Sequence, residues 1–273
     1  MKFVKMQGLG NDFIIIENIN GSFKGNEVEF AKRICHRKFG VGADGLVIIE
    51  KSIIADAKMI IINSDGSRAN MCGNAIRCVG KYIYEFMKIK KNKLSIETGD
   101  GVKYINLSID NEKVTLITVN MGKASFDGKD ILLNNRENLI NEEVIIENKN
   151  YTLTSLLVGV PHTILVNDKN EYSIKDGKII EKSYLFKEGS NVNIVDIIDE
   201  TSIKVHTWER GAGETLACGT GCCASVVALN KLGLCSDCVD VKTNGGNLKV
   251  EIKENIIYMI GIADFICKGE VVY

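Results

Sequence analysis

The chain has 273 residues, of which 45% are hydrophobic and 25% are charged, and its formal net charge is −1. These values suit a soluble protein with one large domain or two of average size. Lysine and arginine are spread along the chain, so nothing indicates nucleic acid or an anionic membrane as a partner, and we expect a small-molecule substrate. Lysines, glycines and an aspartate interrupt the apolar residues of the N-terminal stretch MKFVKMQGLGND, so we expect no export signal.

Strand patterns dominate the first half of the chain. Apolar and β-branched runs bounded by turn residues predict strands at residues 12–18, 45–50, 57–63, 102–109 and 113–121. After the first run, Asn26 is expected to cap a helix that ends at the cationic stretch His36-Arg37-Lys38 before Gly40. The apolar face of this helix would carry Val28, Ala31, Ile34 and Cys35.

Two further helices are expected, each just after a Cys-Gly pair. The first would run from about Asn74 to Lys88, because apolar residues recur there at steps of three and four. Its core-facing stripe consists of Ile76, Val79, Ile83 and Phe86. The second would run from about Gly221 to Lys231, before a C-terminal Gly233, and its apolar residues surround so much of the helix that it should be buried.

The second half repeats the first in outline, with strands expected at residues 163–168, 190–196 and 201–209 before the last helix. When the Cys-Gly pairs are aligned, Asn63 and Glu209 each fall nine residues before the cysteine, just after an expected strand. We therefore expect two related α/β domains, residues 1–121 and 122–262. The C-terminal strand, residues 263–273, is expected to join the first domain.

Nine cysteines, two of them adjacent at Cys222–Cys223, do not form the pattern of a disulfide framework and indicate a reducing cytoplasm. Cys235 and Cys238 have the spacing of a zinc or dithiol pair, but a structural zinc site usually needs a second close pair, so we expect no metal. The alternative is two buried cysteines near the start of a strand. The cysteines expected to be packing residues among apolar neighbours are Cys35, Cys78, Cys222, Cys223 and Cys267.

The repeated Cys-Gly pairs, Cys72–Gly73 and Cys218–Gly219, have a chemical interpretation. A cysteine just before a helix lies near unpaired backbone N–H groups and the positive end of the helix dipole, which favour thiolate over thiol. If two such helix starts face each other, their N–H groups could hold one carboxylate while the sulfurs flank the carbon attached to it. One sulfur would take the proton of that carbon and the other would return it on the opposite face. This geometry suits racemisation.

The sequence resembles the diaminopimelate epimerases over essentially the whole chain. The resemblance depends on several long motifs in the same order: GLGNDF at 8–13, RKFGVGADG at 37–45, NSDGSRANMCGNAIRC at 63–78, VPH at 160–162, WERGAGETLACGTGC at 208–222 and TNGG at 243–246. It implies two pseudosymmetric domains that close over a cleft, each a mostly antiparallel curved sheet or barrel around a central helix. It also implies a homodimer and no cofactor, pyridoxal phosphate included. The implied reaction interconverts LL- and meso-diaminopimelate, on the route to lysine and cell-wall peptide.

The resemblance also implies roles for individual residues. Cys72 and Cys218 match the acid and base of the family. The backbone cradle of the reacting carboxylate matches Gly73, Asn74, Gly219 and Thr220. Glu209 matches the group near the reacting amino end, and both Glu209 and His162 are expected to influence thiol ionisation. The remaining substrate contacts match Arg210, whose guanidinium fork suits the distant carboxylate, and Asn11, Asn63 and Asn191.

Other interpretations of these residues stay open at this stage. An asparagine after a strand, such as Asn11 or Asn63, is often only a turn residue. His162 could be a core histidine, and Asp12, Asp44 and Asp65 are expected to be structural. The chain also departs from the family pattern, with Val160 in place of an asparagine and Gly45 in place of a glutamine.

Two other enzymatic functions compete with diaminopimelate epimerisation. One is racemisation of another amino acid on the same scaffold. The other is a cysteine hydrolase or acyltransferase in which His162 activates Cys218, although the duplicated Cys-Gly pair then has no explanation. A thiol or metal protein built on Cys235 and Cys238 is a third possibility.

Overall fold

The computed structural model describes residues 1–21, 23, 26–167 and 171–272 of the chain. It divides into two compact units, Met1–Asn120 together with the chain from Gly261 onward, and Met121–Ile260. Two expected strands end at residues that the structure does not describe: Asp168 of the strand 163–168 and Tyr273 of the strand 263–273 lie outside the described residues.

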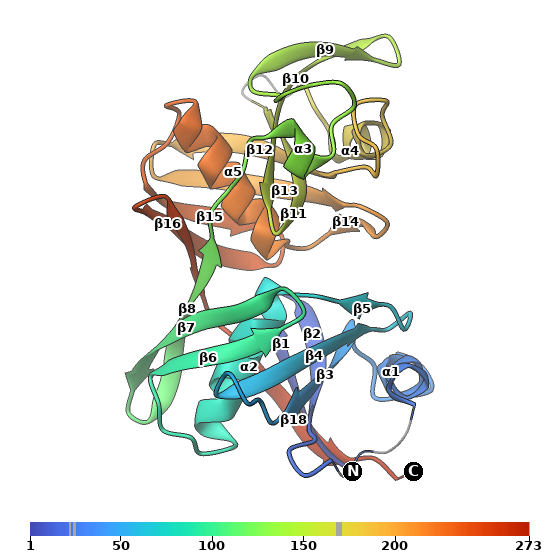
Figure 1. Ribbon diagram of the computed structural model, residues 1–273, viewed down its shortest axis with the longest axis vertical. Coiled ribbons are helices and arrows are strands. Elements are labelled where there is room, and N and C mark those ends of the chain that lie inside the picture. The colour runs from blue at the N-terminus through green and yellow to red at the C-terminus, as the bar shows by residue number, and fades with distance from the viewer. Residues whose placement is uncertain (22, 24–25, 168–170, 273) are drawn as a thin grey trace. The chain divides into compact units, whose positions relative to one another are not determined.

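The first unit is a mixed sheet with two helices (Figure 1). Its sheet runs in the order β18-β1-β2-β3-β4-β6-β7-β8, with the short β5 paired to β4. The pairs β2–β3 and β4–β6 are parallel and the other pairs in this order are antiparallel. The elements are β1 (Lys2–Gly8), β2 (Asn11–Glu17), α1 (Glu27–Cys35), β3 (Gly45–Glu50), β4 (Ala57–Asn63), β5 (Arg68–Ala69), α2 (Gly73–Glu85), β6 (Lys93–Thr98), β7 (Gly101–Asp110), β8 (Lys113–Gly122) and β18 (Asp264–Glu270).

The second unit repeats this order of elements. Its sheet runs β9-β10-β11-β12-β13-β15-β16-β17 with β14 paired to β13, and the parallel pairs β11–β12 and β13–β15 stand where the first unit has β2–β3 and β4–β6. The fold is therefore the expected α/β class, with two pseudosymmetric, mostly antiparallel units. The elements are α3 (Gly128–Ile131), β9 (Glu142–Ile146), β10 (Lys149–Val158), β11 (Val160–Val166), α4 (Ile174–Glu181), β12 (Asn191–Asp199), β13 (Ser202–Glu209), β14 (Gly213–Thr215), α5 (Gly219–Lys231), β15 (Cys238–Thr243), β16 (Gly246–Lys253) and β17 (Ile256–Gly261).

Each sheet curves around one helix. Helix α2 contacts β1, β2, β4 and β7, and α5 contacts β10 to β13 and β16, so strands far apart in the sheet order meet on one helix. Most residues of both helices are buried, as their apolar sequences predict. In the first unit, α1 covers a separate apolar cluster on the sheet that includes Ile14, Leu46 and Ile62. Strands β2 and β3 are thus buried on both faces.

The helix signals in the sequence are mostly confirmed. Asn26 caps α1, because its side-chain oxygen accepts hydrogen bonds from the N–H groups of Val28 at 3.1 Å and Glu29 at 3.3 Å. The last buried helix runs to Lys231 and is followed by Gly233 with φ +71°, as expected of a C-terminal glycine. The prediction for the second helix was wrong at its end: α2 stops at Glu85, because Lys88 adopts a left-handed backbone with φ +61°.

The cysteine predictions hold with two exceptions, Cys267 and Cys238. Cys35, Cys78, Cys222 and Cys223 are buried. The expectation for Cys267 was wrong, because it lies in β18, the end strand of the sheet order, where residues 265–268 are exposed. Cys235 is buried and its thiol donates to the carbonyl of Val226. The expectation that Cys238 would be buried with it was wrong, because Cys238 is exposed at the first position of β15.

None of the helices in the described part of the chain has the length and apolar character needed to span a bilayer.

Candidate active site: two cysteine half-sites

Both units place a cysteine at the start of their central helix. In the first unit β4 ends at Asn63, β5 turns back along it, and Cys72 is the N-cap of α2. In the second unit β13 ends at Glu209, β14 turns back, and Cys218 is the N-cap of α5. Both cysteines have the extended backbone of an N-cap, with φ −143° and φ −118°. Each sulfur is thereby held beside the N-terminus of a buried helix.

In the first half-site the structure brings Asn11, Cys72 and Asn74 together. The sulfur of Cys72 lies 3.7 Å from Oδ1 of Asn11, in the geometry of a thiol donating to an amide oxygen. The same oxygen accepts from Nδ2 of Asn74 at 3.3 Å. Nδ2 of Asn11 in turn donates to the carboxylate of Asp44 at 2.8 Å. Asn11 therefore presents its oxygen, and not its NH2 group, to the sulfur.

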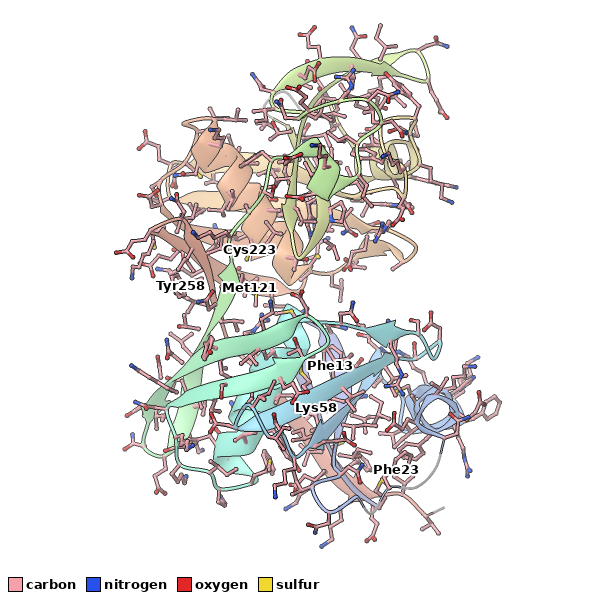
Figure 2. All side chains as sticks on the ribbon, viewed as in Figure 1. Phe13, Phe23, Lys58, Met121, Cys223 and Tyr258 are labelled. Carbon is pink, nitrogen blue, oxygen red and sulfur yellow. The ribbon has the colours of Figure 1, made fainter. Side chains whose placement is uncertain are left out.

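Arg77 holds the other end of this hydrogen-bonded pair of amides, and the sequence analysis did not predict it. Its side chain is 0% exposed, and Nη2 donates to Oδ1 of Asn74 at 2.8 Å. Nη1 donates to the carbonyl of Gly73 and Nε to that of Ile262, both at 3.1 Å. Because the Arg77 guanidinium can only donate and the Asp44 carboxylate can only accept, the side-chain amides of Asn74 and Asn11 between them are each held in a single orientation. On α5 the corresponding position is Cys223, labelled in Figure 2.

The remaining predicted residue of the first unit, Asn63, has a local role in the structure. Its Nδ2 donates to the hydroxyl of Ser67 at 2.9 Å, and its backbone N–H donates to the carbonyl of Ser67 at 2.8 Å. Both bonds close the turn between β4 and β5. The turn interpretation of this asparagine is therefore supported by its contacts.

In the second half-site the sulfur of Cys218 is an acceptor. The backbone N–H of Gly221 donates to it at 3.4 Å, and the hydroxyl of Thr220 lies 3.3 Å away. Burial, and after it the charge of Glu209, raises the pKa of the Cys218 thiol, while the two neighbouring donors lower it by less. The Cys218 thiol is therefore protonated near neutral pH.

The carboxyl group of Glu209 is also perturbed. Burial raises its pKa, and the hydroxyl of Thr215, which donates to Oε1 at 2.7 Å, opposes this rise. Groups with perturbed pKa values gather at functional sites, so the raised pKa of Glu209 near Cys218 favours a catalytic role for this half-site.

Arg210 and Asn191 are joined through the backbone. Oδ1 of Asn191 accepts from the N–H of Arg210 at 2.8 Å, and its Nδ2 donates to the carbonyl of Pro161 at 3.0 Å. The Arg210 side chain is exposed and donates to the carbonyl of Glu188 at 3.0 Å. Asn191 thus ties the start of β12 to β11 and to the residue that follows β13.

His162 is fully buried in β11. Its Nδ1 lies 3.1 Å from Nδ2 of Asn193, and its Nε2 has no hydrogen-bond partner among the described residues. Burial, with a smaller effect from the charge of Arg210, lowers the pKa of this imidazole to about 3. His162 is therefore neutral at physiological pH. Asn193 was not predicted from the sequence, although a polar residue inside a buried strand was a signal for it.

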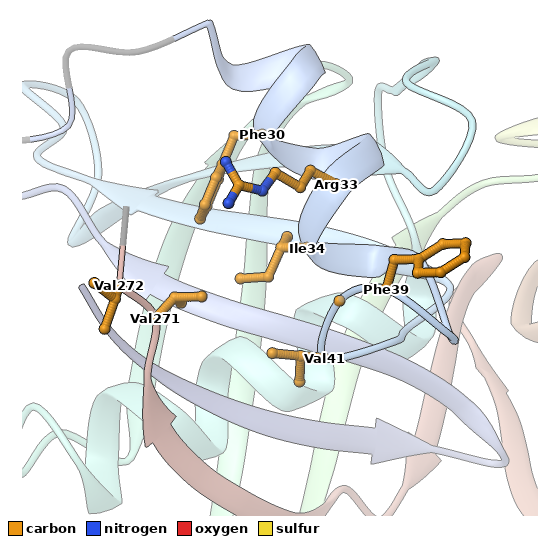
Figure 3. Close-up of a pocket in the computed structure, with 8 residues that line it drawn as sticks. Phe30, Arg33, Ile34, Phe39, Val41, Val271 and Val272 are labelled. Atoms are coloured by element: carbon orange, nitrogen blue, oxygen red, sulfur yellow. The ribbon is translucent and has the colours of Figure 1, made fainter.

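No predicted site residue lines the cavity of about 230 Å³ that the first unit contains (Figure 3). This cavity lies between α1 and the C-terminal segment, and its walls include Phe30, Ile34, Val41 and Val271. Among the described residues, no three histidine, cysteine or acidic side chains are grouped so that they could hold a metal ion.

A duplicated α/β unit with a cysteine at the start of each central helix places this protein among the racemase and epimerase isomerases. Solved structures share the fold at low identity. The structure of a hydroxyproline epimerase from Agrobacterium vitis matches with a TM-score of 0.72 at 14% identity, over 99% of this chain and 90% of that one. A PhzF-family phenazine biosynthesis protein from Bacillus anthracis matches with a TM-score of 0.71 at 14% identity, over 100% and 99%.

The chain belongs to the diaminopimelate epimerase family. The family model described as diaminopimelate epimerase matches residues 3–127 and 154–266. The diaminopimelate epimerase of Clostridium perfringens is 53% identical over 269 residues, which cover 98% of both chains. That of Alkaliphilus metalliredigens is 46% identical, over 98% of this chain and 96% of its own.

Proposed function

We propose that this protein interconverts LL- and meso-2,6-diaminopimelate without pyridoxal phosphate or another cofactor, using one thiol on each face of the reacting carbon. Membership of the diaminopimelate epimerase family supports the substrate and the role in lysine and peptidoglycan precursor synthesis. The observation that carries the mechanism is the repeated N-cap cysteine, Cys72 on α2 and Cys218 on α5, at the same place in two units of one topology.

The reaction needs one thiolate and one thiol. The thiolate on one face takes the α-proton, and the electron pair of the broken C–H bond spreads onto the substrate carboxylate. The thiol on the other face then gives its proton to the carbon, and the protonation of the two sulfurs is exchanged. Backbone N–H groups at both helix starts, at Gly73, Asn74, Gly219 and Thr220, stabilise the charged carboxylate. Such fixed donors are each worth about 3 kcal/mol in a site that excludes water.

The other substrate contacts are assigned to the two half-sites. Oδ1 of Asn11 is an acceptor beside Cys72, where a thiol or an ammonium group can donate to it. In the second unit, Glu209 accepts from the reacting amino group and Arg210 holds the distant carboxylate through two parallel bonds. Asn63 and Asn191 complete the distal contacts. Glu209 and His162 influence the ionisation of the thiols.

The working form is proposed to be a homodimer in the cytoplasm. Family resemblance supports the dimer, and the nine cysteines, which do not follow the pattern of a disulfide framework, are compatible with a reducing compartment.

Hydrogen exchange in deuterium oxide tests the substrate. The wild-type protein is incubated with LL- and meso-diaminopimelate, lysine, histidine, glutamate and lanthionine, and α-deuterium is measured for each. We expect the fastest exchange with the two diaminopimelate isomers, and we expect Arg210→Met to lower kcat/KM for them with little change in melting temperature. Faster exchange with lysine or histidine would show that one of these amino acids, and not diaminopimelate, is the preferred substrate. No exchange with any of the six would favour the hydrolase alternative.

Val160 makes this test informative. It stands where the family pattern has an asparagine, and its side chain is 38% exposed at the start of β11. A valine side chain cannot donate to a distal carboxylate. Selectivity for diaminopimelate would then depend more heavily on Arg210, Asn63 and Asn191.

A further inference from the structure

Three polar side chains form a buried cluster in the second unit, here called the His162 cluster. It consists of His162 on β11, Asn193 on β12 and Thr207 on β13, which are 0%, 0% and 3% exposed. The hydroxyl of Thr207 donates to Oδ1 of Asn193 at 3.0 Å. Nδ2 of Asn193 lies 3.1 Å from Nδ1 of His162. The three side chains therefore form one continuous chain of hydrogen bonds.

The first unit has apolar residues in the same three places. Asn193 on β12 is paired with Thr207 on β13. The corresponding pair in the first unit is Val47 on β3 with Ile61 on β4. His162 is paired with Asn191 across β11 and β12, and the corresponding pair across β2 and β3 is Phe13 with Gly45. Phe13, the counterpart of His162, is labelled in Figure 2. The apolar set Phe13, Val47 and Ile61 is buried as well. Since both sets fold into the same architecture, the fold alone does not demand polar groups here, and only their hydrogen bonds offset the cost of burying them.

The cluster packs against the first turn of α5, the helix whose N-cap is Cys218. A Cβ atom on Gly221 would come within 2.3 Å of Oδ1 of Asn193, so only glycine leaves room for this amide. The N–H of Gly221 donates to the sulfur of Cys218 at 3.4 Å. The first unit, which has no amide at this place, has Ala75 as the counterpart of Gly221. The glycine and the polar cluster thus occur together in one half of the repeat.

The bond directions determine the tautomer of His162. Because the Thr207 hydroxyl donates to Oδ1 of Asn193, the NH2 group of that amide faces the imidazole. Nδ1 must then accept, and the single proton of a neutral ring is on Nε2. Nε2 is buried and makes no hydrogen bond within the described residues. The charged and titratable groups around the cluster are Arg210, whose charge acts on His162, and Cys218 and Glu209 of the same half-site.

We propose that Asn193 and Thr207 are positioning residues that hold His162 as a neutral imidazole with its proton on Nε2, an N–H donor to negative charge at the N-terminus of α5. The anion is the thiolate left when Cys218 gives up its proton, or the substrate carboxylate. A donor held in place before the reaction stabilises such charge without rearrangement. With Nδ1 committed to Asn193, the ring does not compete for the proton that moves between the sulfurs. This role rests on the two-thiol function proposed above.

Nitrogen NMR tests the tautomer without any substrate. The chain has three histidines, His36, His162 and His206, so protein labelled with ¹⁵N-histidine gives three ring systems. His36→Gln and His206→Gln variants assign them. We expect the His162 ring to show the Nε2–H tautomer, unchanged between about pH 5 and pH 8, the range in which an ordinary histidine titrates. A proton on Nδ1, or titration within that range, would overturn the proposal.

A matched pair of variants at Thr207 tests the positioning role. Thr207→Val keeps the shape but removes the hydroxyl, whereas Thr207→Ser keeps the hydroxyl. We expect Thr207→Val to mix the two His162 tautomers and to lower kcat/KM by about tenfold, the effect of misplacing one hydrogen-bond donor. Thr207→Ser should restore a single tautomer and most of the turnover. A Thr207→Val protein with an unchanged tautomer, or with an altered tautomer and unchanged turnover, would contradict the role.

Asn193→Leu gives a second readout if Thr207→Val fails to fold. This substitution retains the volume of the amide and removes both of its hydrogen bonds, so the His162 tautomer should change further than in Thr207→Val. A wild-type protein that lacks activity on diaminopimelate but shows the expected tautomer would sink the proposed function alone. A normal epimerase with the other tautomer would sink the present inference alone.

Discussion

Arg77→Met should destabilise the first unit strongly, and the structure allows the size of the effect to be worked out. The wild-type guanidinium is completely buried and donates to Ile262, Gly73 and Asn74. Methionine fills much of the same volume but leaves the Ile262 carbonyl and the Asn74 side-chain oxygen without these donors. A hydrogen bond from a charged donor contributes about 1.5–3 kcal/mol, and its loss should cost more at the buried Asn74 oxygen than at Ile262, which is 43% exposed. Removing a buried charge offsets part of this cost.

The net loss in the free energy of unfolding is therefore expected to be about 3 kcal/mol. For a unit of this size, 3 kcal/mol corresponds to a fall of roughly 6–12 °C in melting temperature. Differential scanning calorimetry measures the shift, with Arg33→Met as control because Arg33 is an exposed arginine on α1. Turnover at a temperature where the variant is folded should fall too, since Asn74 and Asn11 lose their fixed orientation. A melting temperature within about 1 °C of that of wild type would refute this reasoning.

Three further predictions concern single groups. If the two sulfurs face each other as proposed, mild oxidation should join Cys72 to Cys218 and inactivate the protein reversibly, since a disulfide requires Cα atoms roughly 4.4–6.8 Å apart. Mass spectrometry that finds both thiols free in the inactive protein would contradict this. Burial raises the pKa of Glu209 in the folded protein above its usual value of 4.5. The contribution of this carboxyl group to the free energy of unfolding is therefore complete below about pH 4.5 and is lost as pH rises through the folded-state pKa. Glu209→Gln, which can still accept from Thr215, should therefore gain melting temperature relative to wild type between about pH 4 and pH 7; a difference that does not vary with pH would argue against the shift. Asn26→Ala should lower the free energy of unfolding by about 1 kcal/mol in urea titrations, since it removes the α1 cap, and an unchanged midpoint would count against that cap.

The sequence predicted the repeat because its signals are local. A cysteine before a buried helix and a polar residue nine positions earlier recur in both halves, and the structure places both cysteines at N-caps. The apolar period also identified α2 and α5. Its continuation to Phe86 and Lys88 extended the second helix too far, because periodicity does not register the left-handed backbone at Lys88.

Residues that act through long-range contacts escaped the sequence analysis. Arg77 looks like a surface residue of an amphipathic helix, and only the return of the C-terminal segment provides the Ile262 carbonyl that it binds. Asn193 and Thr207 are adjacent only through strand pairing. Cys267 was expected in the core because its neighbours are apolar, yet an end strand exposes such residues. For Arg77, Asn193 and Thr207 the deciding contact joins residues that are not neighbours in the sequence, and for Cys267 the deciding fact is the place of its strand in the sheet.

The central claim, one thiol on each face of the substrate, is tested most directly by stereochemistry in single serine variants. Cys72→Ser and Cys218→Ser should both lose epimerisation, because serine is a poor base, while each keeps one working thiol. Given a β-halogenated diaminopimelate, a lone thiolate can remove the α-proton and expel halide only from the isomer whose proton faces it. We predict that each variant eliminates halide from one stereoisomer and that the two variants choose opposite isomers. Elimination from both isomers by either variant, or the same preference in both, would contradict two thiols on opposed faces.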